Sequence, residues 1–402
     1  MLARTLPPAG TVLGPKDLVI LLKPSGPKNR RLSLESAITS AFEGSTARLF
    51  SSGRAAMTVI LEAMAEARPD RKTVLVPGYT CFSVAASILR AGLRVRPVDV
   101  DLTTLSYSPI ALAEAYDPGV LCILSGNLFG SPDDLPFLEG FAAARGIFFL
   151  DDAAQALYAT VGERWAGSFG DVGIFSLDKG KNITTMEGGA ALIRNPELMG
   201  IVDRRWRQLP NRPIRTTPTL LAKLLVYAVF LRPSLYTLPA RALPLGKTPF
   251  ETSFPIAKYS SLLAPLAERL LARVEEITEA RRVRAEWIHN AIPSTPLIAA
   301  PTATSDGAVH LRFPLVLADQ EIRDRALMAL SAAGLGATRF YPTALNEIPE
   351  LQDSLDPNSP PTPNARALAH RILTLPTHEY VEMRDVRRMG EILDDIVQTR
   401  SN

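Results

Sequence analysis

The stretch Ile147-Phe-Phe-Leu-Asp-Asp-Ala-Ala-Gln155 is an apolar run that ends in two carboxylates. On both sides of it, short apolar runs alternate with stretches whose apolar residues recur at helical spacing. This alternation predicts a mainly parallel sheet covered by helices on both faces, which is an α/β fold. The predicted strands are 73–77, 94–98, 121–125, 147–151, 172–177 and 189–193, and the predicted helices are 55–67, 83–91 and 135–145.

Four regions of the 402-residue chain differ in pattern, and the length itself exceeds one ordinary core. We expect an irregular, proline-rich N-terminal arm at 1–45 and a large domain at 46–255. A long helical pattern predicts a linking helix within 256–292, and the pattern of 293–402 predicts a small α+β domain. In the small domain we expect strands at 309–317 and 337–341 and helices at 322–333, 364–372 and 385–397.

The composition argues against several classes of protein. The net charge of +3 is too small to indicate a nucleic-acid partner. Two cysteines without a CxxC pair and four histidines without a cluster predict no metal site. The N-terminal MLARTLPPAG lacks the apolar run of a secretory signal, so a cytoplasmic location is expected.

Small and polar residues gather where the predicted strands end, which is the edge at which parallel sheets bind ligands. Phe50-Ser-Ser-Gly-Arg-Ala-Ala56 opens a helix whose first amides could bind phosphate, although a serine N-cap is the simpler interpretation. The Asp151-Asp152 pair could keep a pyridinium nitrogen protonated, as pyridoxal phosphate requires, or could serve as a metal ligand or helix cap.

Two further segments suit the same cofactor. Lys179 and Lys181 follow the strand at 172–177 within a polar loop that ends at Gly188-Gly189. A buried lysine there could form a Schiff base, whereas a lysine near a strand end is usually a solvated surface group. Val76-Pro-Gly-Tyr-Thr-Cys-Phe-Ser83 could present an aromatic face to a planar ring.

Taken in order, these segments resemble the DegT/DnrJ/EryC1/StrS family of pyridoxal-phosphate-dependent aminotransferases. The resemblance covers about residues 46–193 and rests on both the order and the spacing of the motifs. It implies the aspartate-aminotransferase (type I) fold with pyridoxal 5′-phosphate as cofactor. The matching segments are Ser52-Gly-Arg-Ala-Ala56, Pro77-Gly-Tyr-Thr80, Val98-Asp-Val-Asp101, Asp151-Asp-Ala-Ala-Gln155, Gly167-Ser-Phe-Gly-Asp171, Phe175-Ser-Leu-Asp-Lys-Gly-Lys-Asn182 and Glu187-Gly-Gly189.

The resemblance implies roles for individual residues. Lys181, five residues after Ser176, occupies the family's Schiff-base position, whereas Lys179 falls outside the pattern. Asp152 matches the carboxylate that pairs with the pyridinium nitrogen, and Gln155 matches the residue near the ring hydroxyl. The residues expected to hold the cofactor's phosphate are Ser52, Gly53, Arg54, Ala55 and Ser176.

Two positions depart from the family's pattern. Arg54 stands where the family has a threonine, so a guanidinium that could pair with phosphate or with substrate replaces a hydroxyl. Cys81 stands at the position of the ring-stacking aromatic residue, with Phe82 one residue later. We expect Cys81 and Phe82 beside the cofactor ring.

The activity implied by the resemblance is transfer of an amino group from a donor, expected to be glutamate, to a keto-sugar, expected to be nucleotide-linked. The retained Lys181 argues against the family's dehydratase branch, which has a histidine at that position. A pyridoxal-phosphate lyase, an aminotransferase for a non-sugar ketone and a non-catalytic regulator that binds the cofactor remain open. The family's sites form between subunits, so a homodimer is also implied.

The segment 204–250 differs in composition from the rest of the chain, because it holds nine Lys or Arg and seven prolines but no Asp or Glu. Its apolar stretch from Leu220 to Leu231 is too short to span a bilayer, which needs roughly 20 apolar residues. One interpretation is contact with an anionic membrane surface. The other is that it packs on the sheet or the dimer interface while its arginines bind sugar-nucleotide phosphates.

Overall fold

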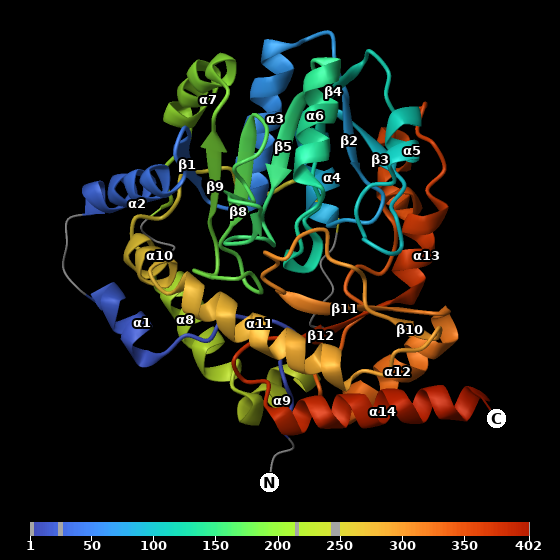
Figure 1. The fold of residues 1–402 in the computed structure, drawn as a ribbon. Coiled ribbons are helices and arrows are strands. Elements are labelled where there is room, and N and C mark those ends of the chain that lie inside the picture. Colours follow the sequence, from blue (N-terminus) through green and yellow to red (C-terminus); the bar gives the residue numbers. More distant parts are fainter. Residues whose placement is uncertain (1–3, 23–26, 214–216, 243–249, 402) are drawn as a thin grey trace.

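A seven-stranded sheet forms the centre of the large domain (Figure 1). The computed structural model describes residues 4–22, 27–213, 217–242 and 250–401. The strand order is β1-β9-β8-β5-β4-β2-β3, and β9 alone runs against the other six. This arrangement confirms the expected mainly parallel sheet. The strands are β1 Thr46–Phe50, β2 Thr73–Pro77, β3 Arg94–Val98, β4 Val120–Leu124, β5 Phe148–Asp152, β8 Val172–Ser176 and β9 Gly189–Ile193.

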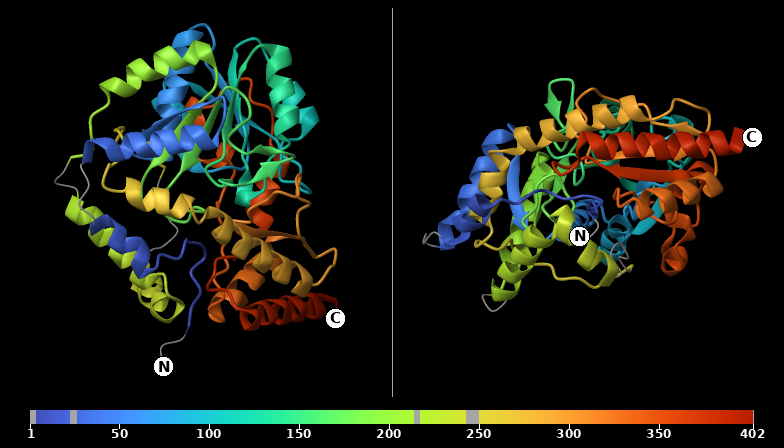
Figure 2. Two further views of the ribbon diagram at one scale, coloured as in Figure 1. Left: turned by 60° about the vertical axis from the view of Figure 1, so that its left-hand side comes forward. Right: turned by 90° about the horizontal axis from the view of Figure 1, so that it is seen from below.

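Both faces of the sheet are buried, which is why its central strands are continuous apolar runs. In β5, Phe148 and Leu150 join one hydrophobic cluster, whereas Phe149 points to the cluster on the opposite face. The first cluster is completed by α3 Gly53–Ala67, α4 Phe82–Arg90 and α7 Pro196–Gln208, and the second includes α6 Leu135–Arg145. The two views in Figure 2 show helices on both sides of the sheet. The remaining elements of this part are α5 Pro109–Glu114, the 3-10 turn η2 Leu128–Gly130 and the hairpin of β6 Thr160–Val161 and β7 Arg164–Trp165.

The expectation of an irregular N-terminal arm is wrong for much of residues 4–45. The structure has α1 Pro15–Val19, the 3-10 turn η1 Ile20–Leu22 and the long helix α2 Pro27–Ala41, which packs on β1. The prolines suggested irregular chain, but Pro15 and Pro27 are the first residues of their helices. Proline is favoured at that position because its missing amide would have no partner there.

The structure has two helices where the pattern at 256–292 predicts a single linking helix. Helix α10 spans Ala264–Leu271 and α11 spans Val274–Ala291, with Ala272 and Arg273 between them. Both helices pack on the large domain through buried apolar residues such as Leu270 and Ile277.

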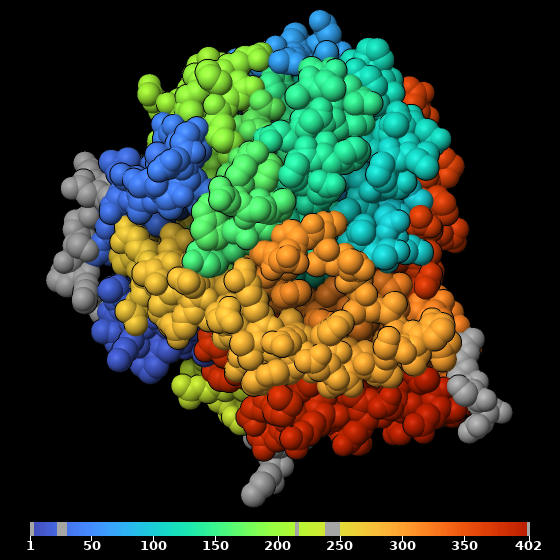
Figure 3. All heavy atoms as spheres, in the orientation of Figure 1, coloured from blue at the N-terminus to red at the C-terminus, as the bar shows by residue number. Residues whose placement is uncertain are grey.

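The small domain is built on an antiparallel three-stranded sheet of β10 Ile298–Ala299, β11 Arg312–Leu317 and β12 Ile372–Pro376. The strand expected at 337–341 is wrong, because only Thr338 forms an isolated bridge and Phe340 has a φ of 60°. In the space-filling view the small domain, coloured orange to red, lies directly against the large domain (Figure 3). Its helices are α12 Gln320–Ala332, η4 Leu345–Glu347, η5 Pro349–Ser354, α13 Pro363–Arg371 and α14 Met383–Ser401.

The basic segment 204–250 supplies the end of α7 and then α8 Thr217–Phe230 and α9 Pro233–Ala242. Helix α8 buries Leu224 completely but leaves Leu225 57% and Val226 54% exposed. Residues 214–216 and 243–249 of this segment lie outside the described residues. In the part of the chain that the structure describes, no helix is long and apolar enough to cross a membrane.

Candidate active site

The N-terminus of α3 and the end of β8 form a small cradle. Ser52 caps α3, and its Oγ accepts a hydrogen bond of 3.1 Å from the amide of Ala55. Gly53 lies so close to Ser176 that a Cβ on the glycine would be 3.1 Å from the serine Cβ and 3.3 Å from its Oγ. The first amides of a long helix and a neighbouring hydroxyl are the groups that bind a phosphate. Of the expected amides, that of Ala55 is already used by the cap.

The two carboxylates at the end of β5 have different environments. Asp151 is completely buried and accepts hydrogen bonds from the Gly167 amide (2.6 Å), Asn127 Nδ2 (2.8 Å) and Ser125 Oγ (3.0 Å). Burial raises its pKa, and these donors oppose that shift. Asp151 therefore fixes the turn that begins at Gly167 to the end of the sheet.

Asp152 is buried as well, but it makes fewer hydrogen bonds to its carboxylate than Asp151 does. Its carboxylate accepts a hydrogen bond of 3.1 Å from the Ala154 amide. Burial raises its pKa to about 6, while the nearby Lys181 ammonium acts in the opposite direction. A carboxylate that has lost most of its hydration gains the most from a cationic partner placed against it.

Lys181 sits in the lysine loop, which we define as residues 177–188 between β8 and β9. The next residue, Asn182, anchors this loop to α11. Its Nδ2 donates to Thr278 Oγ1 (2.9 Å), and its Oδ1 accepts from Nε of the buried Arg281 (2.9 Å). The Lys181 side chain itself is half-buried.

Gln155 connects the sheet edge to the small domain. Its Oε1 accepts from the Phe129 amide (3.2 Å), and its Nε2 donates to the hydroxyl of Tyr341 (3.3 Å). Burial, together with the nearby Cys81 thiol, raises the pKa of the Tyr341 hydroxyl, and the ring centroid of Tyr341 lies 6.1 Å from that of Phe82. The structure thus brings Gln155, Cys81 and Phe82 together around an aromatic residue that the sequence analysis did not select.

Two site residues were missed, and each had a weak signal. Tyr341 lies in the aromatic pair before Pro342, where a strand was expected instead of a loop. Asn127 comes shortly after β4, separated from it by Ser125 and Gly126, and has a positive φ of 41°, which asparagine tolerates better than most residues. Its amide also donates to the carbonyl oxygen of Asp152 (3.0 Å).

Arg54 is directed toward the segment that follows residue 249. Its guanidinium lies 4.7 Å from the centroid of the Phe254 ring, and Arg90 lies 5.0 Å from the same ring. The expectation that Arg54 pairs with phosphate or with substrate is not tested by this contact.

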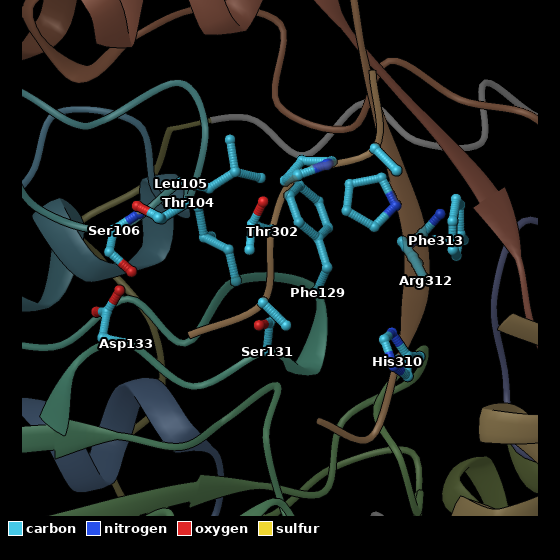
Figure 4. A pocket seen from close by; sticks show the side chains of 15 residues that line it. Thr104, Leu105, Ser106, Phe129, Ser131, Asp133, Thr302, His310, Arg312 and Phe313 are labelled. Atoms are coloured by element: carbon cyan, nitrogen blue, oxygen red, sulfur yellow. The ribbon is translucent and has the colours of Figure 1, made fainter. Parts of the chain in front are cut away.

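A separate cavity lies between the two domains (Figure 4). Its lining includes Ser106, Asp133, Phe129 and His310, and burial lowers the pKa of His310 to about 4, so this histidine is neutral. None of the ten predicted cofactor residues lines it. Phe129 connects the two places, because its ring faces the cavity while its amide donates to Gln155. Within the described residues, no group of three or more His, Cys, Asp or Glu could hold a metal ion.

Comparisons with known proteins identify similar sequences and similar folds. The model of the DegT/DnrJ/EryC1/StrS aminotransferase family matches residues 22–209 and 257–394. The UDP-N-acetyl-3-dehydro-α-D-glucosamine 3-aminotransferase of Acidithiobacillus ferrooxidans is 25% identical over 345 residues, covering 85% of this chain and 82% of that protein. Protein MosB of Rhizobium meliloti is 36% identical over 148 residues, covering 37% of this chain and 29% of that protein. The first curated relatives are matched over between 29% and 44% of their length.

Two solved structures share the fold. Helicobacter pylori PseC, an aminotransferase involved in the biosynthesis of pseudoaminic acid, has a TM-score of 0.78 at 16% identity, covering 98% of this chain and 100% of that one. The Escherichia coli GDP-4-keto-6-deoxy-D-mannose-3-dehydratase with bound hydrated PLP has a TM-score of 0.76 at 18% identity, covering 97% and 100%. These likenesses confirm the expected fold.

Proposed function

Because the chain belongs to the DegT/DnrJ/EryC1/StrS aminotransferase family, we propose that it is a pyridoxal-phosphate-dependent aminotransferase that uses nucleotide-linked keto-sugars. The observation that carries this proposal is the place of two groups at one edge of the sheet: the buried carboxylate of Asp152 ends β5, and Lys181 lies in the loop that follows the neighbouring strand β8. The proposed donor is glutamate.

The residues at the sheet edge fit the cofactor in charge and in shape. We assign its phosphate to the amides of Gly53 and Arg54 and the hydroxyl of Ser176, because Gly53 has no side chain between the helix terminus and that serine. We assign the ring hydroxyl to Gln155 and the ring face to Cys81 and Phe82. When bound, the cofactor supplies an electron sink for the carbanion that forms at the donor's α-carbon.

The chain's own groups do the rest of the chemistry. Asp152 holds a negative charge against the pyridinium nitrogen and keeps it protonated. The Lys181 amine would attach to the cofactor covalently. Once released, it would take the proton from the donor's α-carbon as general base and deliver it to the cofactor's C4′ carbon as general acid. Asp151 takes no part in these steps and instead holds Asn127 and the Gly167 turn in place.

The test is an amination assay with purified protein, glutamate and a panel of nucleotide-linked keto-sugars, analysed by mass spectrometry. We expect replacement of a keto oxygen by an amino group together with formation of 2-oxoglutarate. A simple keto acid and a cyclic non-sugar ketone are the matched controls, and preferred turnover of either would replace the acceptor proposed here. Product formed without any amino donor would instead identify a lyase.

Two expectations about assembly and location stay predictions. One is a homodimer, and the other is a cytoplasmic protein whose 204–250 segment either packs on the protein or contacts an anionic membrane. Leu224 of α8 packs in the core, whereas the exposed Leu225 and Val226 beside the exposed Lys223 leave room for membrane contact. Co-sedimentation with anionic liposomes at low salt tests it, with Leu225→Ser/Val226→Ser as the control variant and neutral liposomes as the control surface. If no more protein sedimented with anionic liposomes than with neutral ones, the predicted contact with an anionic membrane would be wrong.

A further inference from the structure

Two of the stretches that lie outside the family match, 1–21 and 210–256, contact each other and the lysine loop through residues that the structure describes. The N-terminal strap, which we define as residues 4–14, begins on the small domain, where the Leu6 amide donates to the Gly334 carbonyl (2.8 Å). Farther along, the carbonyl of Pro8 accepts from Arg312 (3.0 Å). Figure 2 shows this segment rising from the N-terminus past α8.

The strap reaches the backbone of the lysine that would carry the cofactor. Thr11 is 1% exposed, and its hydroxyl oxygen lies 3.0 Å from the carbonyl oxygens of both Lys181 and Asn182, so its single proton is shared between these two acceptors. One residue earlier, the Gly10 carbonyl accepts from Arg281 (2.7 Å), which also holds the Asn182 side chain. Within the loop, the Lys181 amide makes a turn hydrogen bond of 3.4 Å to the Asp178 carbonyl, and the strap contacts add further support to the backbone at Lys181 and Asn182.

Helix α8 in turn fixes Thr11. The Tyr227 hydroxyl accepts from the Thr11 amide (2.9 Å) and donates to the Thr11 carbonyl (3.2 Å). Gly10 packs so tightly against the same helix that a Cβ there would lie 2.7 Å from Leu231 Cδ1. The strap is therefore held between α8 on one side and the lysine loop on the other.

We propose that Thr11 and Tyr227 are positioning residues for Lys181, and that the strap and α8 together brace the lysine loop. Thr11 holds the loop directly through two carbonyl oxygens. Tyr227 acts indirectly, because its hydroxyl holds the backbone of Thr11 in place. The importance of the position for catalysis rests on the proposed function of Lys181, whereas the bracing itself does not.

The experiment compares Thr11→Val with Thr11→Ser. Valine has nearly the shape of threonine without the hydroxyl, and serine keeps the hydroxyl without the methyl. In cofactor-free protein, hydrogen–deuterium exchange of the lysine loop should be about tenfold faster in Thr11→Val and unchanged in Thr11→Ser, because a buried hydrogen bond is lost only in the first. Tyr227→Phe, which keeps the ring, should speed exchange in the same loop by a smaller factor.

A second readout follows the cofactor. The rate at which added pyridoxal phosphate becomes attached to Lys181, measured by borohydride trapping and peptide mapping, should fall in Thr11→Val but not in Thr11→Ser. Loop exchange that is equal in the valine and serine variants would overturn the proposal. A rise spread equally over β11 and β12 would also overturn it, because it would show general destabilisation. Failure of the wild-type protein to bind the cofactor would refute the proposed function, yet the exchange comparison would still decide the bracing.

Discussion

The edge of the sheet and the segments that support it differ in how they are encoded. At the edge, residues 148–189 carry Asp152, Gln155, Ser176 and Lys181 in short motifs at or shortly after the end of a strand. The support comes from Thr11, Tyr227 and Arg281, which are far apart in sequence and meet only in the folded chain. The comparison teaches that the reacting groups follow local rules, whereas their exact placement depends on long-range contacts. Substitutions in the two regions should therefore have different effects.

The largest effect is expected from Asp152→Asn. An amide cannot hold a negative charge against the pyridinium nitrogen, so turnover should fall about a thousandfold, which is the usual scale for a lost electrostatic contact at the reacting centre. Steady-state kinetics of the cofactor-loaded protein measure this. Turnover within threefold of the wild type would show that Asp152 is not the partner of the ring nitrogen.

The neighbouring substitution Asp151→Asn should act on stability instead. It turns an amide toward buried donors and should lower the free energy of unfolding by about 3 kcal/mol. Urea denaturation of the two variants, side by side, gives the comparison. If Asp151→Asn stayed as stable as the wild type but lost turnover, the assignment of the two carboxylates would be reversed.

The pH dependence of stability should also separate Asp152 from the rest of the protein. Its pKa is about 6 in the folded chain and near 3.8 when unfolded, so the folded state binds the proton more tightly. The stability from this group is present below about pH 4 and is lost as pH rises through 6, a change of about 3 kcal/mol. In cofactor-free protein, the free energy of unfolding of Asp152→Asn should therefore rise relative to that of the wild type between pH 4 and pH 7. A constant difference between the two unfolding curves would contradict the burial argument.

The smallest effect is expected in the supporting region. Tyr227→Phe keeps the aromatic ring but removes the hydroxyl bonded to Thr11, and should cost about 1 kcal/mol of unfolding free energy. Thermal denaturation of cofactor-free protein measures it. A loss of 3 kcal/mol or more would mean that α8 holds the whole domain together and not only the strap.

Much of the large domain could be predicted from the sequence, since buried parallel strands are short apolar runs and their ends carry the polar residues. The expected strands at 73–77, 94–98 and 189–193 have the observed bounds. The region before β1 could not be predicted in the same way, because Pro27 was taken as a sign of irregular chain although it begins α2. Tyr341 was assigned to a strand, and its contact with Gln155 joins residues 186 positions apart. No local pattern reports a contact at that separation.

The most direct test of the central claim is the absorption spectrum of the cofactor-loaded protein before and after addition of L-glutamate, with Lys181→Ala measured in parallel. Wild-type protein should show a band near ~420 nm, as expected for cofactor attached to a lysine, and glutamate should shift it to a pyridoxamine-type band. Lys181→Ala should lack the lysine-attached form and convert glutamate at least about a hundredfold more slowly. A bound cofactor that ignores glutamate and other amino donors, or a Lys181→Ala protein with the spectrum and rate of the wild type, would contradict the account.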